Sequence, residues 1–301
     1  MGYSLVDIRD NQNVIDWFPG DHPAMPDIVR RGPREAGALK RGCGSCHLAN
    51  GKGRPENAQP GGLPAAYFIR QIQDFRLGLR RSADWRKPNT YTMINLAMSM
   101  TDEEVNAAAA YFAGVKWTTP WVRVVETDKV PKTRIAGNLF IATEDARTEP
   151  IAGRIIEVPE NEEQAEVNRN PRSGFVAYVP TGSLAKGKDL VTTGGTMIVA
   201  GQVVRKSLEC NSCHGKDLSG IADVPPIAGR SPSYMARQLY DFQQGTRIGS
   251  AAPLMRMVVA NLTEEDIVAI TAYVASRPPS GGAHQDVPVP ANRPVIDTAA
   301  R

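Results

Sequence analysis

The chain has 301 residues, a length that suggests about two domains. Hydrophobic residues make up 42% of the sequence and charged residues 22%, which is typical of a folded globular protein. No apolar run approaches the length of a membrane span, and a formal net charge of +3 is too small to indicate nucleic acid as a partner.

The first motif along the chain is Cys-x-x-Cys-His at residues 43–47. It follows residues 1–30, which include Trp17 and Phe18 and which we expect to lie as an arm on the first domain. Cys-x-x-Cys-His is the signature of covalent haem c attachment, because two thiols one short turn apart can add to both vinyl groups of a porphyrin while the histidine binds the iron. The motif therefore predicts a haem site.

Two helices are predicted after this motif. Residues 65–79 carry apolar side chains at helical spacing, and Gly78 lies near their carboxyl end. A capping box, Thr101 with Glu104, begins a second, alanine-rich helix. A further helix is expected before the motif, near residues 34–42.

Residues 118–181 match neither half of the chain. They hold short β-prone apolar pieces, such as residues 154–158 and 174–179, which prolines and an acidic polar stretch separate. The alternation of apolar residues argues against disorder. We expect an irregular, partly stranded connector that packs on one or both of its neighbours.

The second half of the chain repeats the first. The segment at residues 67–78 recurs as residues 234–245 at an offset of 167, and the capping box recurs as Thr263 with Asp266 at an offset of 162. The first copy therefore has a loop that is five residues longer, and a helix is expected before the second motif, within residues 183–209. The second Cys-x-x-Cys-His follows the first at the offset of 167, so the residues predicted to attach the two haems and bind their irons are Cys43, Cys46, His47, Cys210, Cys213 and His214.

Two other roles for these cysteines are weaker. A redox-active disulfide is expected in a strand–helix setting, which neither copy of the motif has. Two Cys-x-x-Cys pairs can bind zinc, but such pairs usually lie closer together and need no histidine after them. The two haem motifs use all four cysteines of the chain.

The repeat also selects a sixth ligand for each iron. Methionine is a common sixth ligand to haem c, because its soft thioether favours ferrous iron. Met93 and Met255 are equivalent at the offset of 162, whereas Met98, Met100 and Met257 have no methionine partner. We therefore predict Met93 and Met255 as axial ligands of the haem iron, and favour packing as the role of the other three.

Basic residues gather around Trp85 in the longer loop of the first copy. Pairing with haem propionates or with an acidic partner is possible for them, but solvated charge is the commoner role. Arg70 and Arg237 recur in both copies, which favours propionate or interdomain pairing for that pair. The residues of the loop are Arg76, Arg80, Arg81, Arg86 and Lys87.

Both copies resemble class I cytochrome c domains, and the tandem arrangement is similar to that of dihaem cytochromes of the c4 type. The resemblance rests on Tyr-x-x-x-Gln-x-x-x-Phe-x-x-Gly at residues 67–78 and 234–245. It also rests on the motif Met-x-x-x-x-x-x-[Leu/Met]-Thr-[Asp/Glu]-Glu, which leads into the last helix of each copy. The resemblance implies two covalently bound haem c groups.

The resemblance carries further expectations. A proline carbonyl usually accepts a hydrogen bond from the proximal histidine in such domains, which by position implies Pro60 and Pro226. Tyr111 and Tyr273 would pack where the terminal helices cross. In c4-type proteins a short linker brings the haem propionates of the two domains together. Because residues 118–181 intervene here, the resemblance leaves the face-to-face pairing of the two haems open.

The predicted fold is mainly α, with two class I cytochrome c domains in tandem joined by a long, irregular, partly β connector. The N-terminal arm is predicted at residues 1–30 and the proline-rich, extended tail at residues 279–301. The remaining boundaries are residues 31–117 for the first domain, 118–181 for the connector and 182–278 for the second domain.

The expected function is transfer of single electrons by a dihaem c-type cytochrome, between a dehydrogenase or quinol-oxidising donor and a downstream cytochrome or oxidase. No catalytic residue is predicted. Haem c is attached outside the bacterial cytoplasm and no signal peptide is visible, so we expect the mature form of a periplasmic protein. Redox proteins are the expected partners.

Two alternatives remain open. The chain could be the dedicated electron-accepting subunit of a larger oxidoreductase, whose chemistry would be identical. It could also be a dihaem peroxidase-like enzyme with one open iron, although matched methionines argue against that. A cysteine-ligated haem is excluded, because no cysteine remains. His22 and His284 lie outside the two copies and are expected to be surface residues rather than ligands.

Overall fold

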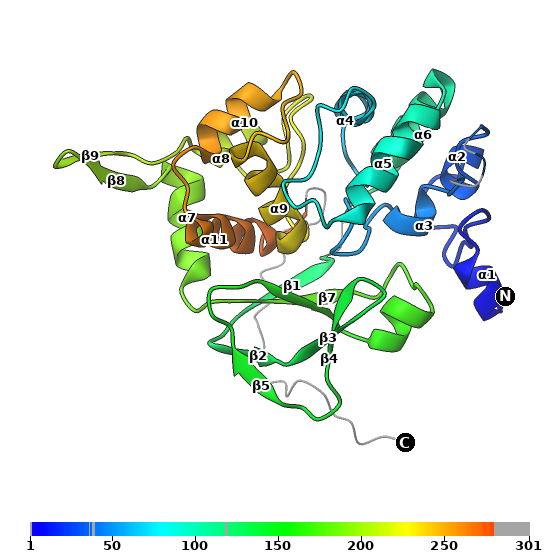
Figure 1. Cartoon of the computed structure of the whole chain (residues 1–301), viewed down its shortest axis with the longest axis horizontal. Coiled ribbons are helices and arrows are strands. Elements are labelled where there is room, and N and C mark those ends of the chain that lie inside the picture. Colours follow the sequence, from blue (N-terminus) through cyan, green and yellow to red (C-terminus); the bar gives the residue numbers. More distant parts are fainter. Residues whose placement is uncertain (1, 36, 38–39, 118–119, 280–301) are drawn as a thin grey trace.

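The computed structural model describes residues 2–35, 37, 40–117 and 120–279. Two helical modules lie side by side, and the strands of the connector lie along one side of both (Figure 1). The first module contains α1 (Leu5–Arg9), α2 (Asp27–Arg30), α3 (Gly44–His47), α4 (Ala65–Arg76), α5 (Pro88–Ser99) and α6 (Asp102–Gly114).

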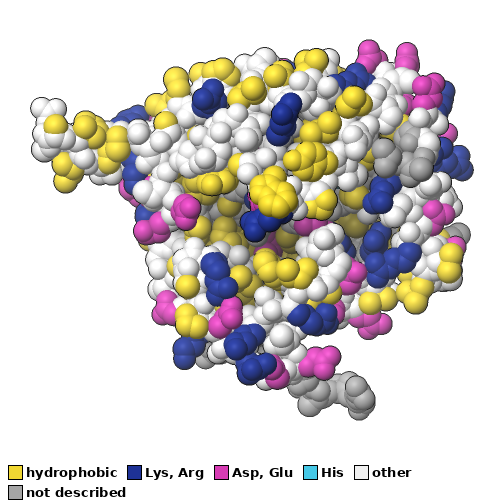
Figure 2. Space-filling model, viewed as in Figure 1, with side chains coloured by type: hydrophobic (Ala, Val, Ile, Leu, Met, Phe, Trp, Pro, Cys, Tyr) yellow, Lys and Arg dark blue, Asp and Glu magenta, His cyan; other side chains and the backbone are white. Residues whose placement is uncertain are grey.

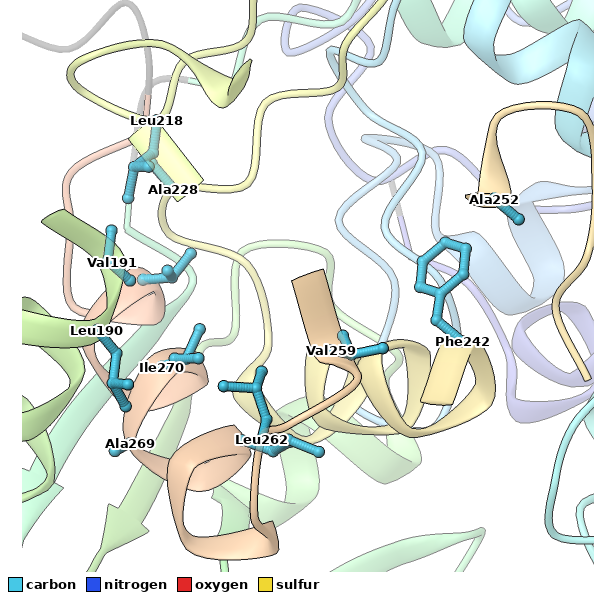
Figure 3. Packing of buried hydrophobic residues seen from close by; sticks show 12 residues of the cluster. Leu190, Val191, Leu218, Ala228, Phe242, Ala252, Val259, Leu262, Ala269 and Ile270 are labelled. Atoms are coloured by element: carbon cyan, nitrogen blue, oxygen red, sulfur yellow. The ribbon is translucent and has the colours of Figure 1, made fainter. Parts of the chain in front are cut away.

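The second module repeats this arrangement with a hairpin added before its haem motif. Side chains of α7, α10 and α11 meet in its core, with Val191, Val259 and Ile270 among them (Figure 3). Its elements are α7 (Ser183–Thr193), β8 (Thr196–Val199), β9 (Gln202–Arg205), α8 (Cys210–His214), α9 (Pro232–Gln243), α10 (Ala252–Val259) and α11 (Glu264–Ala275).

The connector has its own sheet, in the order β1-β7-β6, with β7 buried along its whole length. Its elements are β1 (Val122–Glu126), β2 (Lys129–Pro131), β3 (Thr133–Ala136), β4 (Leu139–Ala142), β5 (Thr148–Pro150), β6 (Ile156–Pro159), the π-helical turn η2 (Glu163–Val167) and β7 (Phe175–Val179). The first strand, β1, pairs in parallel with the last, β7, and Val122 lies opposite Phe175. The connector therefore returns the chain close to where it left the first module.

The predicted helix at residues 65–79 and its repeat around residues 234–245 are confirmed as α4 and α9. Both capping boxes are confirmed too, since Thr101 and Thr263 exchange two hydrogen bonds each with the acid three residues later. The helix expected within residues 183–209 is α7. Part of the range 34–42 lies outside the described residues, and α2 is the helix described before the first motif. Residues 280–301 of the tail also lie outside them.

The two modules pack directly on each other, although a long connector separates them in sequence. Arg80 donates hydrogen bonds to Gln71 of its own module, at 3.0 Å, and to Gln238 of the other, at 2.7 Å. Arg247 does the reverse, at 3.2 Å to Gln238 and 2.7 Å to Gln71. Because β1 and β7 are neighbours, the connector separates the modules in sequence but not in space.

The connector is attached to both modules at one buried point. Glu157 of β6 is 1% exposed, and its carboxylate accepts a hydrogen bond from the Ser231 hydroxyl at 2.8 Å. The Ser231 N–H in turn donates to the Gln59 side chain of the first module at 2.7 Å. Burial raises the pKa of Glu157. All three parts of the chain thus form one body.

Gly187 lies where α7 crosses α11, and its substitution by alanine should destabilise the protein. A Cβ atom there would clash with the Ala269 carbonyl oxygen and come within 2.7 Å of Tyr273 Cβ. Although alanine favours helices, overpacking of this kind costs about 1–3 kcal/mol. Urea unfolding of Gly187→Ala should show that loss. Ala185→Gly, at an exposed position of α7, gives the helix propensity alone, and an equal loss there would contradict the packing account.

Asp266, in the first turn of α11, should stabilise the second module above pH 4. Burial alone would raise its pKa, but hydrogen bonds from Lys206, the Thr263 N–H and Lys186 lower it to about 2. A carboxyl whose pKa is lower in the folded state stabilises above its unfolded pKa and loses this effect as the pH falls. Asp266→Asn should lower the free energy of unfolding by ~2 kcal/mol at pH 7.

The difference between wild type and Asp266→Asn should shrink as the pH falls from 4 to 2, which urea unfolding at several pH values would measure. Glu265→Gln is the matched control, because its 77% exposed carboxylate shares Lys186 but should contribute less than about 1 kcal/mol. A difference for Asp266→Asn that stayed constant down to pH 2 would contradict the account.

Candidate haem sites

A cavity of about 630 Å³ lies between the modules and reaches both Cys-x-x-Cys-His motifs. It is bounded by apolar side chains of α4, α5, α9 and α10 and by polar residues at the interface. The structure places all eight predicted site residues on its wall; they are Cys43, Cys46, His47, Met93, Cys210, Cys213, His214 and Met255.

Each motif forms about one turn of helix at the wall of the cavity. His47 ends α3 and His214 ends α8, so each histidine follows its cysteines within that turn. The four cysteines form no disulfide with one another. Burial raises the pKa of the Cys43 thiol to about 12 and that of the Cys210 thiol to about 11. The described residues also contain no cluster of His, Cys, Asp and Glu suited to a metal ion.

Each histidine is oriented by a backbone carbonyl. His47 Nδ1 lies 2.8 Å from the Ala58 oxygen, and His214 Nδ1 lies 2.8 Å from the Pro225 oxygen. With Nδ1 donating, Nε2 is the nitrogen left for iron, and burial lowers the pKa of both rings toward the neutral, metal-binding form. The prolines implied by the resemblance are therefore wrong: Ala58 takes the place of Pro60, and Pro225 that of its neighbour Pro226.

The structure separates the methionines by their exposure. Met93, on α5, and Met255, on α10, are partly buried and reach the cavity. Met98 is 67% exposed and Met257 is 59% exposed, so packing, the favoured interpretation of both, is wrong. Met98 lies five residues after Met93, and Met257 lies two residues after Met255. On a helix, both spacings point the side chain away from the cavity. Met100 is buried in the core, as predicted.

One methionine that lines the cavity was missed by the sequence reasoning. Met235 faces it from α9, where the repeat places Phe68 in the first module. Phe68 also lines the cavity. Phe68, the residue equivalent to Met235, cannot bind iron. The match between Met235 and Phe68 in the repeat therefore indicates that both are wall residues, and this match could have identified Met235 from the sequence.

Three arginines that line the cavity, Arg80, Arg230 and Arg247, are each less than one-tenth exposed. Among the described residues none of them forms an ion pair with a carboxylate. Arg230 donates instead to the carbonyl oxygens of Pro226, at 2.7 Å, and of Gly61, at 3.0 Å, and burial lowers its pKa to about 10. Buried positive charge that no carboxylate contacts directly suits an anionic group in the cavity, such as haem propionates.

The other basic residues fall into two groups. Arg70 pairs with Asp223 of the second module at 2.9 Å, and Arg237 donates to the Pro55 carbonyl of the first at 2.5 Å, so interdomain pairing is confirmed for both. Most of the residues around Trp85 have local partners: Arg76 with Asp102, Arg81 with the Gly78 carbonyl, and Arg86 with Asp84. Arg80 differs from them, because it is buried between the modules.

The two remaining histidines give no further ligand. His22 lies near the Pro23 oxygen and Asp16 through its two ring nitrogens, and it does not line the cavity. It is buried against Tyr111 rather than on the surface, which corrects that expectation. His284 lies outside the described residues. Paired thiols, a carbonyl-oriented imidazole and a thioether in each module, with buried arginines between them, thus fit two haem c groups.

Comparisons with known proteins support the same architecture. The family model described as cytochrome c matches residues 36–116 and 185–278. Cytochrome c4 of Pseudomonas aeruginosa is 23% identical over 81% of this chain and 88% of its own. The thiosulfate dehydrogenase electron acceptor of Stutzerimonas stutzeri is 24% identical over 78% of each chain. No helix among the described residues is long and apolar enough to cross a membrane.

Among solved structures, reduced recombinant cytochrome c4 from Pseudomonas stutzeri has a TM-score of 0.47 and 20% identity, and the match covers 78% of this chain and 93% of that one. The cytochrome c model matches both modules and more than half of the residues. The chain therefore belongs to the cytochrome c family, with two cytochrome c domains that bind two covalently attached haem c groups.

Proposed function

We propose that the protein carries single electrons between a dehydrogenase or quinol-oxidising donor and a downstream cytochrome or oxidase, through haem 1 at residues 43–47 and haem 2 at residues 210–214. Haem iron supplies the one-electron ferric–ferrous couple. The observation that carries the proposal is the shared cavity, in which each module supplies one histidine and one matched methionine. Two complete ligand pairs suit a carrier rather than an enzyme with an open iron.

The residues have distinct roles in this proposal. The four cysteines tether the porphyrins, while His47 and His214 bind the irons through Nε2. Met93 and Met255 complete the coordination and exclude small ligands. Arg80, Arg230 and Arg247 neutralise propionates at the interface, and the apolar helices lower the local dielectric constant, which tunes the reduction potential.

The names of the relatives favour the same class. Cytochrome c4 and an electron acceptor of thiosulfate dehydrogenase are among them, together with a cytochrome subunit of sulfide dehydrogenase from Chlorobaculum tepidum that is 33% identical over 30% of this chain. They support a second candidate, a dedicated electron-accepting subunit of a larger oxidoreductase. Co-purification from the native source distinguishes a free carrier from a subunit, and cell fractionation tests the proposed periplasmic location.

The domain boundaries are part of the proposal. We assign residues 31–117 and 182–278 to the two haem domains and residues 118–181 to the connector. Limited proteolysis of the haem-loaded protein tests this assignment. Cleavage within 31–117 or 182–278, outside the protruding hairpin at residues 196–205, before any cleavage elsewhere would contradict it.

An optical redox titration with carbon monoxide added to the reduced protein tests the coordination. Two low-spin haems that do not bind carbon monoxide are expected, because a methionine occupies the sixth position of each iron. A high-spin component that binds carbon monoxide would instead favour the peroxidase-like alternative. Absence of two attached haems from the purified protein would contradict the proposal altogether.

A further inference from the structure

The two haem motifs differ in how far the rest of the chain covers them. At the first motif the N-terminal arm lies against the cysteines: the Gly42 N–H donates to the Asn11 carbonyl at 2.8 Å, and a Cβ atom on Gly44 would lie 3.0 Å from the Val14 side chain. At the second motif Ser212 and Cys213 are exposed. The same sequence element is therefore covered in one module and open in the other.

The connector covers the loop that follows the first motif. Asn50 donates to the Pro171 carbonyl at 2.6 Å, and Arg54 pairs with Glu166 at 2.7 Å. Leu48 is buried with Trp121 and Phe175 in one apolar cluster. The arm and the connector thus cover the first motif and the loop that follows it.

Exposed apolar side chains lie around the open second motif. Leu208 and Leu254 line the cavity and are 44% and 67% exposed, so they lie at its mouth. Ile221 is 54% exposed, and its side chain lies 3.5 Å from the position of a Cβ on Gly215, which directly follows the motif. We call Leu208, Ile221 and Leu254 the haem 2 rim.

The repeat shows that this composition is not a property of the fold. At the offsets of 167 and 162, the rim residues correspond to Arg41, Arg54 and Thr92 of the first module. Each exposed apolar side chain of the second copy therefore replaces a polar one of the first. Clustered apolar exposure beside a site indicates a contact surface for another molecule.

The hairpin β8–β9 extends the apolar surface. It stands out from the body and carries hydrophobic side chains (Figures 1 and 2). Ile198 and Val203 are cross-strand neighbours, 75% and 72% exposed, and the hairpin ends five residues before Cys210. A short chain segment thus joins the hairpin to the haem 2 rim.

Two of the charges next to this surface are held in ion pairs. Arg205, at the base of the hairpin, pairs with Glu209 at 3.2 Å, and Asp223 pairs with Arg70 at 2.9 Å. The three rim side chains themselves carry no charge, so the rim is complementary to an apolar surface.

We propose that the haem 2 rim is the site where redox proteins exchange electrons with this chain, and that haem 1 exchanges electrons with them only by way of haem 2. The partner is a redox protein that presents an apolar surface around its own centre. This inference rests on the proposed function, because it requires both haems to be redox-active.

Electron self-exchange tests the proposal without a known partner, since a second copy of the chain presents the same apolar rim. The probe is the reduced protein mixed with its oxidised form, and NMR line broadening of the haem methyl protons gives the rate. Leu208→Arg with Leu254→Thr, which introduces the first module's residues, should lower the rate at least about tenfold. Met98→Arg, at a 67% exposed methionine of the first module, is the matched control and should stay within about twofold.

Solvent access gives a second readout that does not depend on electron transfer. A neutral gadolinium chelate should relax the methyl protons of haem 2 more strongly than those of haem 1. Equal relaxation of both haems, or an equal fall in rate for Met98→Arg, would overturn the proposal. The proposal would also be overturned if the wild type, but not the double variant, bound phosphatidylcholine–phosphatidylglycerol vesicles. The rim would then be a membrane contact.

Failure of this inference is distinguishable from failure of the proposed function. The optical spectrum of each variant is recorded first, and two low-spin haems show that the sites are intact. An unchanged self-exchange rate in an intact double variant overturns the rim assignment alone. A parent protein without two such haems overturns the proposed function instead.

Discussion

Replacing Met255 with alanine is expected to leave the iron of haem 2 without its sixth ligand. The purified variant should show a high-spin component and bind carbon monoxide when reduced, whereas the wild type should do neither. The reduction potential at this site should fall by ~100 mV or more, because the axial ligand is the strongest single influence on haem potential. Absorption spectroscopy and a redox titration measure both changes.

Two methionines of the same module give the controls. Met257→Ala, at a 59% exposed position on the same helix, should leave spectrum and potential unchanged. Met235→Leu keeps an apolar side chain on the cavity wall and should do the same. A carbon monoxide complex in Met235→Leu but not in Met255→Ala would transfer the ligand role to α9. Met93→Ala should reproduce the Met255→Ala result at haem 1.

The internal repeat was enough to predict α4, α6, α9 and α11 and the eight candidate site residues that line the cavity. Periodic apolar positions gave α4 and α9, and the acid three residues after Thr101 and Thr263 gave the starts of α6 and α11. Sequence patterns of this kind depend only on residues that are close in sequence, so they can be recognised without knowledge of the tertiary contacts. The exposure of Met98 could not be predicted in the same way, because it depends on which face of α5 meets the cavity.

The packing of the two modules could not be predicted from the length of the connector. The length of a connector sets only the largest distance between two domains. This connector folds into a sheet in which its first and last strands are neighbours, so it does not hold the modules apart. A signal was nevertheless present. Tyr67, Gln71 and Arg80 recur as Tyr234, Gln238 and Arg247, and polar side chains repeated on an otherwise apolar helix face indicate an interface. Arg230 has no counterpart in the repeat, so no such signal existed for it.

Removing the charge of Arg80 is expected to have two effects: it should weaken the interface between the modules and lower the reduction potential of a haem. Its guanidinium donates to the Tyr234 hydroxyl at 3.0 Å and to Gln238 at 2.7 Å, and Arg80→Leu leaves both without this donor. Loss of hydrogen bonds to a buried charged group costs about 1.5–3 kcal/mol each before relaxation. Urea unfolding of Arg80→Leu should therefore show a clear loss of stability.

The potential should move in a direction fixed by electrostatics. Ferric haem carries one more positive charge than ferrous haem, so a buried cation nearby favours the reduced form. With an effective dielectric constant near 20, a unit charge about 8–16 Å away contributes ~1–2 kcal/mol, equivalent to about 40–90 mV for one electron. Arg80→Leu should lower the potential by an amount of that order.

Arg80→Lys separates the two effects. Lysine keeps the positive charge but lacks the planar fork that reaches Gln71 and Gln238 at once, so the potential should stay near that of the wild type while stability falls. Arg247→Leu should lower the stability and the potential as much as Arg80→Leu does, because Arg247 makes the equivalent hydrogen bonds to Tyr67 and Gln71. Equal potentials in Arg80→Leu and the wild type would show that the arginine joins the modules without tuning the haems. A fall in Arg80→Lys as large as in Arg80→Leu would assign the shift to geometry rather than charge.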